Sequence, residues 1–272
     1  MPRVALGLEY DGARFSGWQT QKDRSGVQDA VEVALSSFVG QQPVPTVCAG
    51  RTDAGVHATG QVVHLDSPVR RDPQAWVRGV NRYLPRSVSI RWARDVPDHF
   101  HARFSAVNRA YEYWILNDPV RSPLYEERAG WVFHPLDAAA MHTAAQALVG
   151  THDFSAFRSA ECQAASPVRE LRRFDVDRFG RMLRVRVVAN AFLHHMVRNL
   201  VGTLVYVGMG RHPPQWAFDV LAGRDRAAAA PTFAACGLYL TRVEYDRTFD
   251  LPDGPEHVAC GLWCEPESRS AG

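Results

Sequence analysis

The feature that most constrains the fold is the spacing of apolar residues over the first hundred positions. Val4 to Tyr10 alternates as a strand does, whereas residues 26–40 carry an apolar stripe at helical spacing and end in glycine. The elements predicted next are strands at 46–50 and 60–66, a helix at 72–84 that begins Asp-Pro, and a strand at 87–96. This β-α-β-β-α-β order is typical of the ferredoxin-like fold.

The second half of the sequence repeats this mixture loosely. It predicts a strand at 109–116, a helix at 137–148, a hairpin at 168–189 that turns at "RFG", helices at 192–208 and 213–223, and a strand at 237–245. We therefore expect an α+β protein with two ferredoxin-like halves around a mostly antiparallel sheet. The expected domains are 1–105 and 106–248, followed by a loosely ordered tail at 249–272 that is rich in Pro, Gly and Glu.

The sequence is not typical of a secreted protein or of a protein that spans a membrane. The N-terminus alternates like a strand and has no apolar signal-peptide core, and the longest apolar run, 191–209, contains two histidines, an arginine and an asparagine. The five cysteines are odd in number and scattered, including Cys260 and Cys264 in the tail. This pattern favours a reduced, cytoplasmic protein over a disulfide scaffold.

Arginine supplies nearly all of the positive charge, because Lys22 is the only lysine among 31 basic residues. Genome base composition is one explanation for this bias. The arginines nevertheless gather in two segments: Arg70, Arg71, Arg78, Arg82 and Arg86 in the first half, and Arg169, Arg172, Arg173, Arg178, Arg181, Arg184 and Arg186 in the second. Guanidinium groups bind phosphates well, so both segments are candidate polyanion-binding stripes.

The stretch "CAGRTDAGVHATGQVVHLD" at 48–66 places Arg51, Asp53 and His57 between two strand-like runs. It is either a well-made turn, with Gly55 at positive φ, or an active site. A metal site that recruits Asp53, His57 or His64 together with His194, His195 or Cys162 matches no ligand spacing of known zinc or iron sites. A phosphate-binding loop is excluded because the Gly-rich loop and its lysine are missing.

The stretch resembles the catalytic motif of the tRNA pseudouridine synthases of the TruA family. Four further segments resemble that family in the same order and at compatible spacing: "FHARFSAVNRAYEYWI" (100–115), "GTHDFSAFR" (150–158), "ANAFLHHMVRNLVGTL" (189–204) and "CGLYLTRVEY" (236–245). The resemblance covers roughly residues 3–246. It implies the pseudouridine synthase fold, with a central catalytic cleft.

This resemblance also implies the function. It implies an isomerase that converts uridine to pseudouridine at positions 38, 39 and 40 of the tRNA anticodon stem-loop, without cofactor or metal. Asp53 is the expected essential carboxylate, Tyr111 the ring that stacks on the uracil, and Arg198 the partner of Asp53. Leu238 is expected to line the pocket, and Arg51 to lie in the active site.

Elementary chemistry agrees with these roles. The reaction breaks the N1–C1′ bond and joins C5 to C1′, so no atoms enter or leave, and an ionised carboxylate is a suitable nucleophile or base. A neighbouring guanidinium keeps a desolvated carboxylate ionised. Whether Asp53 attacks C1′, attacks C6 or removes a ribose proton stays open. Tyr111 either accepts the C5 proton or only packs, and His57 either contacts RNA or closes the loop.

Two other classes of function are less consistent with the sequence. A non-catalytic RNA-binding module of ferredoxin-like fold needs no buried Asp–Arg pair and has sheet aromatics that are not found here. A metal-dependent hydrolase requires the ligand spacing that is missing. A tRNA is much larger than this chain, so we also expect a homodimer, with helix 192–208 and the strands near Trp131 as candidate interface elements.

Overall fold

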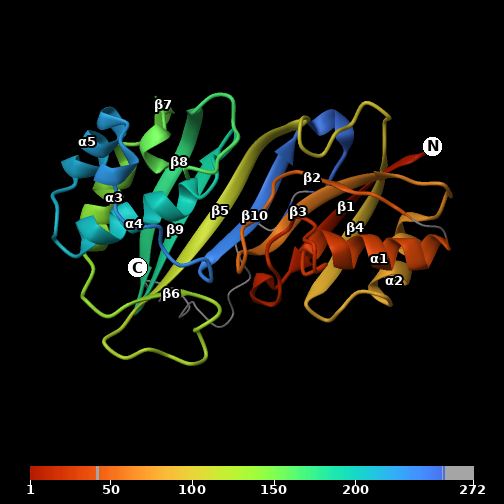
Figure 1. Ribbon diagram of the computed structural model, residues 1–272, viewed down its shortest axis with the longest axis horizontal. Coiled ribbons are helices and arrows are strands. Elements are labelled where there is room, and N and C mark those ends of the chain that lie inside the picture. The colour runs from red at the N-terminus through yellow and green to blue at the C-terminus, as the bar shows by residue number, and fades with distance from the viewer. Residues whose placement is uncertain (41–42, 253, 255–272) are drawn as a thin grey trace, which may run out of the picture. The chain divides into compact units, whose positions relative to one another are not determined.

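The computed structural model describes residues 1–40, 43–252 and 254, which form two compact units. The first unit contains Met1–Tyr111 and returns near the C-terminus with residues 238–254; the second contains Glu112–Gly237. Both units combine helices with mostly antiparallel strands, which confirms the predicted α+β class (Figure 1). The domain limits 1–105 and 106–248 remain predictions, and most of the tail predicted at 249–272 lies outside the described residues.

The first unit follows the predicted β-α-β-β-α-β order. Its elements are β1 (Arg3–Tyr10), α1 (Val27–Val39), β2 (Val47–Cys48), β3 (His57–Asp66), α2 (Pro73–Asn81), β4 (Val88–Val96), the first part of β5 (Ala106–Asn117) and β10 (Leu238–Tyr245). The strand order begins β4-β1-β3-β10, and β2 also pairs with β3. β1 is antiparallel to both of its neighbours, whereas β10 runs parallel to β3 with Tyr239 opposite His57.

Local sequence explains the helices of this unit. α1 begins after Gly26, whose backbone N–H is bound by the Asp29 carboxylate, and it ends at Gly40 in the left-handed conformation. α2 begins at the predicted Asp72 cap. The helices meet where the ring of Phe38 in α1 packs against Trp76 in α2, with 5.2 Å between ring centroids.

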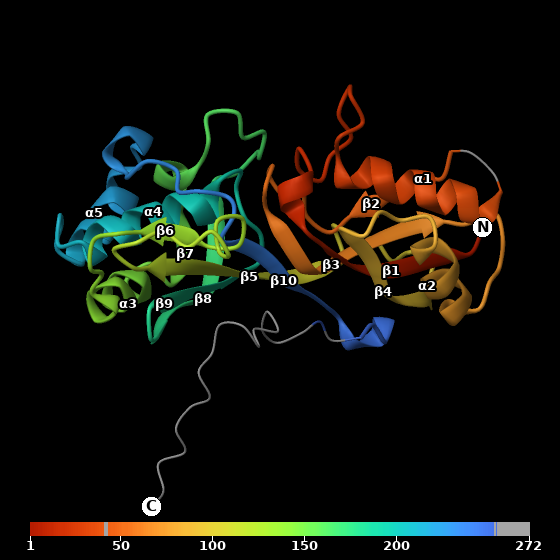
Figure 2. The same ribbon diagram turned by 90° about the horizontal axis from the view of Figure 1, so that it is seen from below.

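The second unit contains the remaining part of β5, together with β6 (Gly130–Val132), α3 (Ala138–Gln146), β7 (Gly150–Asp153), β8 (Val168–Phe179), β9 (Met182–Ala189), α4 (Met196–Gly208) and α5 (Gln215–Gly223). Its strand order is β5-β9-β8-β7, with β6 parallel to β5. The β8–β9 hairpin turns at Gly180, which has φ +56°, as the "RFG" sequence predicts. The three helices pack against one another (Figure 2).

α4 forms the core of the second unit, and it corrects two expectations, the start of the helix and its role in an interface. It begins at Met196, four residues after the predicted start at 192, because His195 has a left-handed φ of +61° that stops the helix there. His194 therefore precedes the helix, and Arg198 lies in its first turn. Eleven of the thirteen α4 residues are buried, so its apolar surface is not available for an interface between copies.

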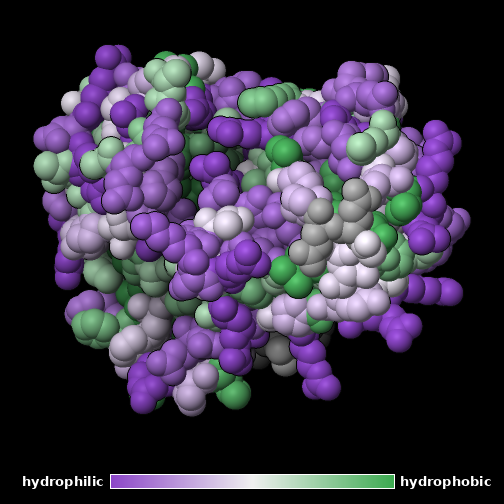
Figure 3. Space-filling model, turned by 45° about the vertical axis from the view of Figure 1, so that its right-hand side comes forward, coloured by the Kyte–Doolittle hydropathy of each residue, from purple (hydrophilic) through white to green (hydrophobic). Residues whose placement is uncertain are grey.

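The face of the molecule in Figure 3 is mostly hydrophilic. On the face displayed in Figure 3, hydrophobic residues stand singly or in small groups among hydrophilic ones. Within the described ranges, each helix is too short or too polar to cross a bilayer.

Candidate active site

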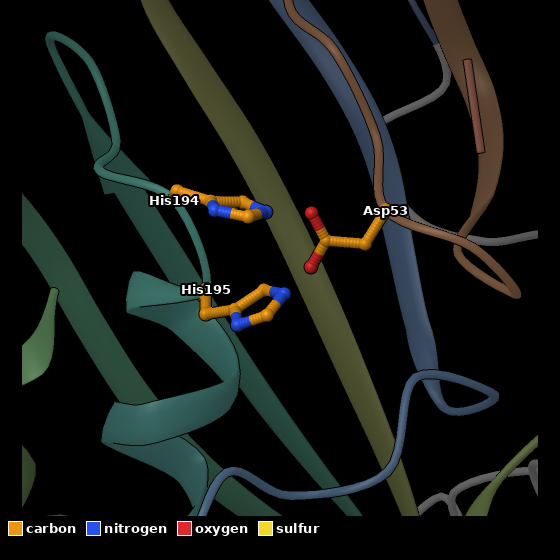
Figure 4. Close-up of side chains that lie close together, drawn as sticks. All are labelled: Asp53, His194 and His195. Atoms are coloured by element: carbon orange, nitrogen blue, oxygen red, sulfur yellow. The ribbon is translucent and has the colours of Figure 1, made fainter. Parts of the chain in front are cut away.

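The Asp53 loop, residues 49–56, connects β2 to β3. Arg51 is exposed and Asp53 is half-buried, and Figure 4 shows Asp53 on the segment that leads toward β3. The Val56 N–H donates to the Asp53 carbonyl at 3.1 Å, and Gly55 has φ +77°. The turn predicted from Gly55 is therefore present. Asp53 belongs to this turn, so the turn is compatible with a functional role for its side chain.

A buried hydrogen-bond network supports the base of this loop. The Tyr10 hydroxyl shares a hydrogen bond of 2.8 Å with the Thr52 hydroxyl, directly before Asp53. The Gln61 amide donates to the Tyr10 oxygen at 3.3 Å and to the Gly50 carbonyl at 2.8 Å. Gln61 is fully buried and Tyr10 is 3% exposed. These three side chains, which the sequence analysis missed, hold the loop on both sides of Arg51.

The segment after β1 packs against the other side of the loop. The Trp18 N–H donates to the Thr52 carbonyl at 2.9 Å. Gly17 has φ +93°, and a Cβ at Gly12 would lie 2.0 Å from the Val56 carbonyl oxygen. Backbone approach this close is possible only for glycine. The loop backbone is therefore fixed both by the segment after β1 and by the hydrogen bonds of Tyr10 and Gln61.

Tyr111 lies in β5 at the end of the first unit and is 8% exposed. Burial raises the pKa of Tyr111 above its usual value, and the negative charge of Asp53 raises it further. The phenol and the carboxylate therefore influence each other within this unit. Because the phenol is protonated at neutral pH, it can accept a proton from uracil C5 only if it gives up its own at the same time.

Leu238 and His57 lie beside the end of the loop. Leu238 is the first residue of β10 and is 5% exposed. His57 is the first residue of β3 and is 1% exposed, with its ring stacked on Tyr239 at a centroid distance of 4.7 Å. This burial favours the loop-closing role of His57 over contact with RNA.

The Nδ1 atom of His57 has two polar neighbours. It lies 3.1 Å from the Gly12 N–H and 3.2 Å from an Asp11 carboxylate oxygen, and one nitrogen cannot both accept from the first and donate to the second. We assign it as the acceptor, because this satisfies a buried backbone N–H. His57 then ties the segment after β1 to the start of β3.

Arg198 belongs to the second unit. Its Nε donates to the Phe233 carbonyl at 2.8 Å, and the Phe233 N–H donates to the Arg198 carbonyl at 3.2 Å. A cation in the first turn of a helix is disfavoured by the helix dipole, so a carboxylate partner stabilises it there. His194 and His195 directly precede the helix, with 4.0 Å between their ring centroids (Figure 4).

A buried arginine connects the Asp53 loop to a second loop of the same unit. Arg109 is 9% exposed, and its guanidinium donates to the carbonyls of Ala49 at 3.1 Å, Arg103 at 2.6 Å and Ala106 at 3.1 Å. The sequence does not single out Arg109, because the strand around it also contains Asn108 and Glu112.

The two arginine stripes differ in how they are neutralised. In the second stripe, five arginines pair with carboxylates of the same unit: Arg172 with Glu170, Arg173 with Asp175, Arg181 with Asp118, and Arg184 and Arg186 with Asp177. The five arginines of the first stripe, in and around α2, are exposed and form no ion pair among the described residues. The charges of the first stripe are therefore not balanced by carboxylates among the described residues.

Comparison with known proteins identifies the family. A family model described as "tRNA pseudouridine synthase" matches residues 8–105 and 144–246. Proteins named tRNA pseudouridine synthase A are similar along almost the whole chain. The one from Bordetella petrii is 58% identical over 254 residues, covering 93% of this chain and 95% of the relative. Those from Herminiimonas arsenicoxydans and Burkholderia multivorans are 55% and 56% identical, each covering 92% of both chains. The chain belongs to the tRNA pseudouridine synthase family.

Proposed function

We propose that this enzyme isomerises uridine to pseudouridine at positions 38, 39 and 40 of the tRNA anticodon stem-loop, with Asp53 as the essential carboxylate. The observation that carries the assignment of Asp53 is the construction of its loop. Polar contacts from Tyr10, Gln61 and the segment after β1 fix the loop backbone, and the Asp53 side chain stays half-buried. Such pre-organisation is what a residue that touches the reacting atoms requires.

The proposed reaction balances without a further reactant. The N1–C1′ bond breaks, the uracil turns, a C5–C1′ bond forms, C5 loses a proton and N1 gains one. Asp53 attacks C1′, attacks C6 or removes a ribose proton, which are three routes that need the same ionised carboxylate. Tyr111 stacks on the detached uracil and, by concerted loss of its own proton, relays the proton from C5.

The other proposed site residues position the substrate and its catalytic carboxylate. Arg198 is proposed as the cation that pairs with Asp53, because its place in the first turn of α4 favours a carboxylate partner. Leu238 lines the uracil pocket, and the exposed Arg51 contacts the RNA. For His57 we propose the indirect role of holding the loop, in agreement with its burial.

We further propose that the enzyme is cytoplasmic and acts as a homodimer. The exposed aromatic rings of Trp131, 43% exposed, and Phe133, 53% exposed, offer apolar surface in and beside β6 for an interface. Light scattering should give about twice the chain mass of 30.3 kDa. A fully active monomer would contradict the dimer.

The function is tested by incubating the protein with unmodified tRNA and mapping pseudouridine by position. We expect product at positions 38, 39 and 40, unchanged activity in the presence of a chelator, and no product with Asp53→Asn. Product at other positions only would contradict the assignment of the anticodon stem-loop. Loss of activity in chelator would contradict metal-free catalysis.

A further inference from the structure

Phe104 is the most exposed aromatic side chain among the described residues. It is 76% exposed, whereas Phe100 in the same loop is completely buried. Its ring stacks on His101 with 4.3 Å between centroids, and the guanidinium carbon of Arg103 lies 5.6 Å from its centroid. Single exposed hydrophobic residues are common, so exposure alone assigns no role. The residues around the ring provide the additional evidence for a binding role.

The loop that carries Phe104 is rigidly built. The N–H groups of Arg103 and Phe104 both donate to Nδ1 of His101 at 3.2 Å. The His101 N–H donates to the Ser105 hydroxyl at 2.9 Å, and the Ser105 N–H donates back to the His101 carbonyl at 2.8 Å. A ring that is already fixed loses little entropy when a ligand stacks on it, so the loop is suited to binding.

His101 is kept in the form that this loop needs. Burial and the charge of Arg3 lower the pKa of His101, so the imidazole is neutral near pH 7 and its Nδ1 can accept both bonds. The ring also packs beside His64, at a centroid distance of 4.8 Å. The support under Phe104 is therefore itself packed and uncharged.

Two observations within the first unit show that the Phe104 loop lies next to the Asp53 loop. Arg109 donates to the carbonyl of Arg103 in one loop and to that of Ala49 in the other. Burial raises the pKa of the Cys48 thiol to about 12, and this rise is opposed by the charges of both Arg51 and Arg103. Both arginines therefore lie near enough to the Cys48 thiol, at the start of the Asp53 loop, for their charges to act on it.

We propose that Arg103 and Phe104 form a binding surface for the RNA beside the target uridine, where Phe104 stacks on an unpaired base and Arg103 binds the adjoining phosphate. This proposal rests on the proposed function and specifies how the substrate is held. A fixed aromatic ring with a neighbouring guanidinium is the combination that binds single-stranded RNA, because every base offers a π-face and every nucleotide a phosphate. Duplex RNA, whose bases are already stacked, does not use the ring.

The test compares Phe104→Ala, Phe104→Tyr and wild type in binding to an anticodon stem-loop RNA and to a fully paired RNA of equal length. Phe104→Ala should weaken stem-loop binding about 5- to 150-fold, the range for losing one stacked base. Phe104→Tyr keeps an aromatic ring and should bind the stem-loop as wild type does. Neither variant should change binding to the paired RNA. Phe218→Ala, which removes an exposed ring from α5, is the matched control. Thermal unfolding verifies that the variants are folded.

Arg103→Gln gives an independent readout. The slope of log affinity against log salt should fall by about 0.7–0.9, as expected for one lost phosphate contact. Equal weakening of stem-loop and paired RNA by Phe104→Ala, or no weakening, would overturn the stacking role. A change in oligomeric mass with unchanged RNA binding would assign the ring to a protein interface instead. Wild-type protein that binds the stem-loop but makes no pseudouridine would refute the proposed function, and the binding of Phe104→Ala would still decide the stacking role.

Discussion

Removal of one hydroxyl at Tyr10 should impair the enzyme although Tyr10 itself touches no substrate. Tyr10→Phe deletes the bond to Thr52 and the weaker one from Gln61, and it leaves the Thr52 hydroxyl buried without this partner. A net hydrogen bond contributes about 0.5–1.5 kcal/mol, and a buried group left unsatisfied costs about 1–3 kcal/mol. Gln61 keeps its bond to Gly50. We expect the free energy of unfolding to fall by about 1–3 kcal/mol.

Catalysis should fall further than binding, because Thr52 precedes Asp53 and misplacement of a reacting group by about 1 Å lowers rates roughly 10²-fold. Single-turnover rates on tRNA should therefore drop while the tRNA Kd stays within a few fold. Burial raises the pKa of Tyr10, so its hydroxyl is protonated over the assay range and the effect should not depend on pH.

A double-mutant cycle isolates the bond. Thr52→Val removes the second partner with little change in shape, and replacing both partners leaves no unsatisfied hydroxyl. The double variant should therefore be more stable than the sum of the two single changes predicts. Strictly additive losses in urea unfolding, together with an unchanged single-turnover rate in Tyr10→Phe, would refute the positioning role.

The other predictions concern the catalytic groups and one histidine. Asp53→Asn should fold and bind tRNA within a few fold of wild type but make no pseudouridine; measurable turnover would remove Asp53 from its role. Tyr111→Phe should bind tRNA normally and lose turnover, and parallel loss of both would indicate packing only. Arg198→Ala should abolish turnover and lower stability by on the order of 1–3 kcal/mol, less than for a fully buried pair because Arg198 is half-buried; unchanged melting and activity would place it outside the site. Burial lowers the pKa of His64 to about 4, so the unfolded chain binds the extra proton between about pH 6.5 and 4, and stability should fall by up to about 3 kcal/mol as pH drops through this range; in His64→Gln this part of the pH dependence should disappear.

The spacing of apolar residues predicted helices and strands well where one face of the element is buried along its whole length. α1, α2 and the β8–β9 hairpin lie within a few residues of their predicted positions, because caps and turn glycines mark their ends. The start of α4 was mispredicted because the apolar pattern continues through "AFLHH", whereas the left-handed backbone of His195 is a local conformation that hydrophobic spacing does not encode. The parallel pairing of β10 with β3 is likewise a long-range contact that local patterns do not reveal.

The sequence proposes site residues where they belong to a recognisable motif. Asp53, Arg51 and His57 stand together in the sequence, and Tyr111, Arg198 and Leu238 were assigned through resemblance. The supporting layer was not predictable in the same way. Tyr10 and Gln61 are 51 positions apart and read as ordinary strand residues, so their joint hold on the Asp53 loop is apparent only from the three-dimensional structure.

The parallel register of β10 on β3 has a consequence for the newly made chain. The first unit needs a strand that is synthesised more than 120 residues after Tyr111, so the edge of β3 beside His57 stays uncovered while the whole second unit emerges from the ribosome. An uncovered strand edge invites pairing with other chains. His57, which follows the Asp53 loop, thus acquires its stacking partner Tyr239 among the last steps of folding, and a product of premature termination before Leu238 is left with an uncovered, aggregation-prone edge.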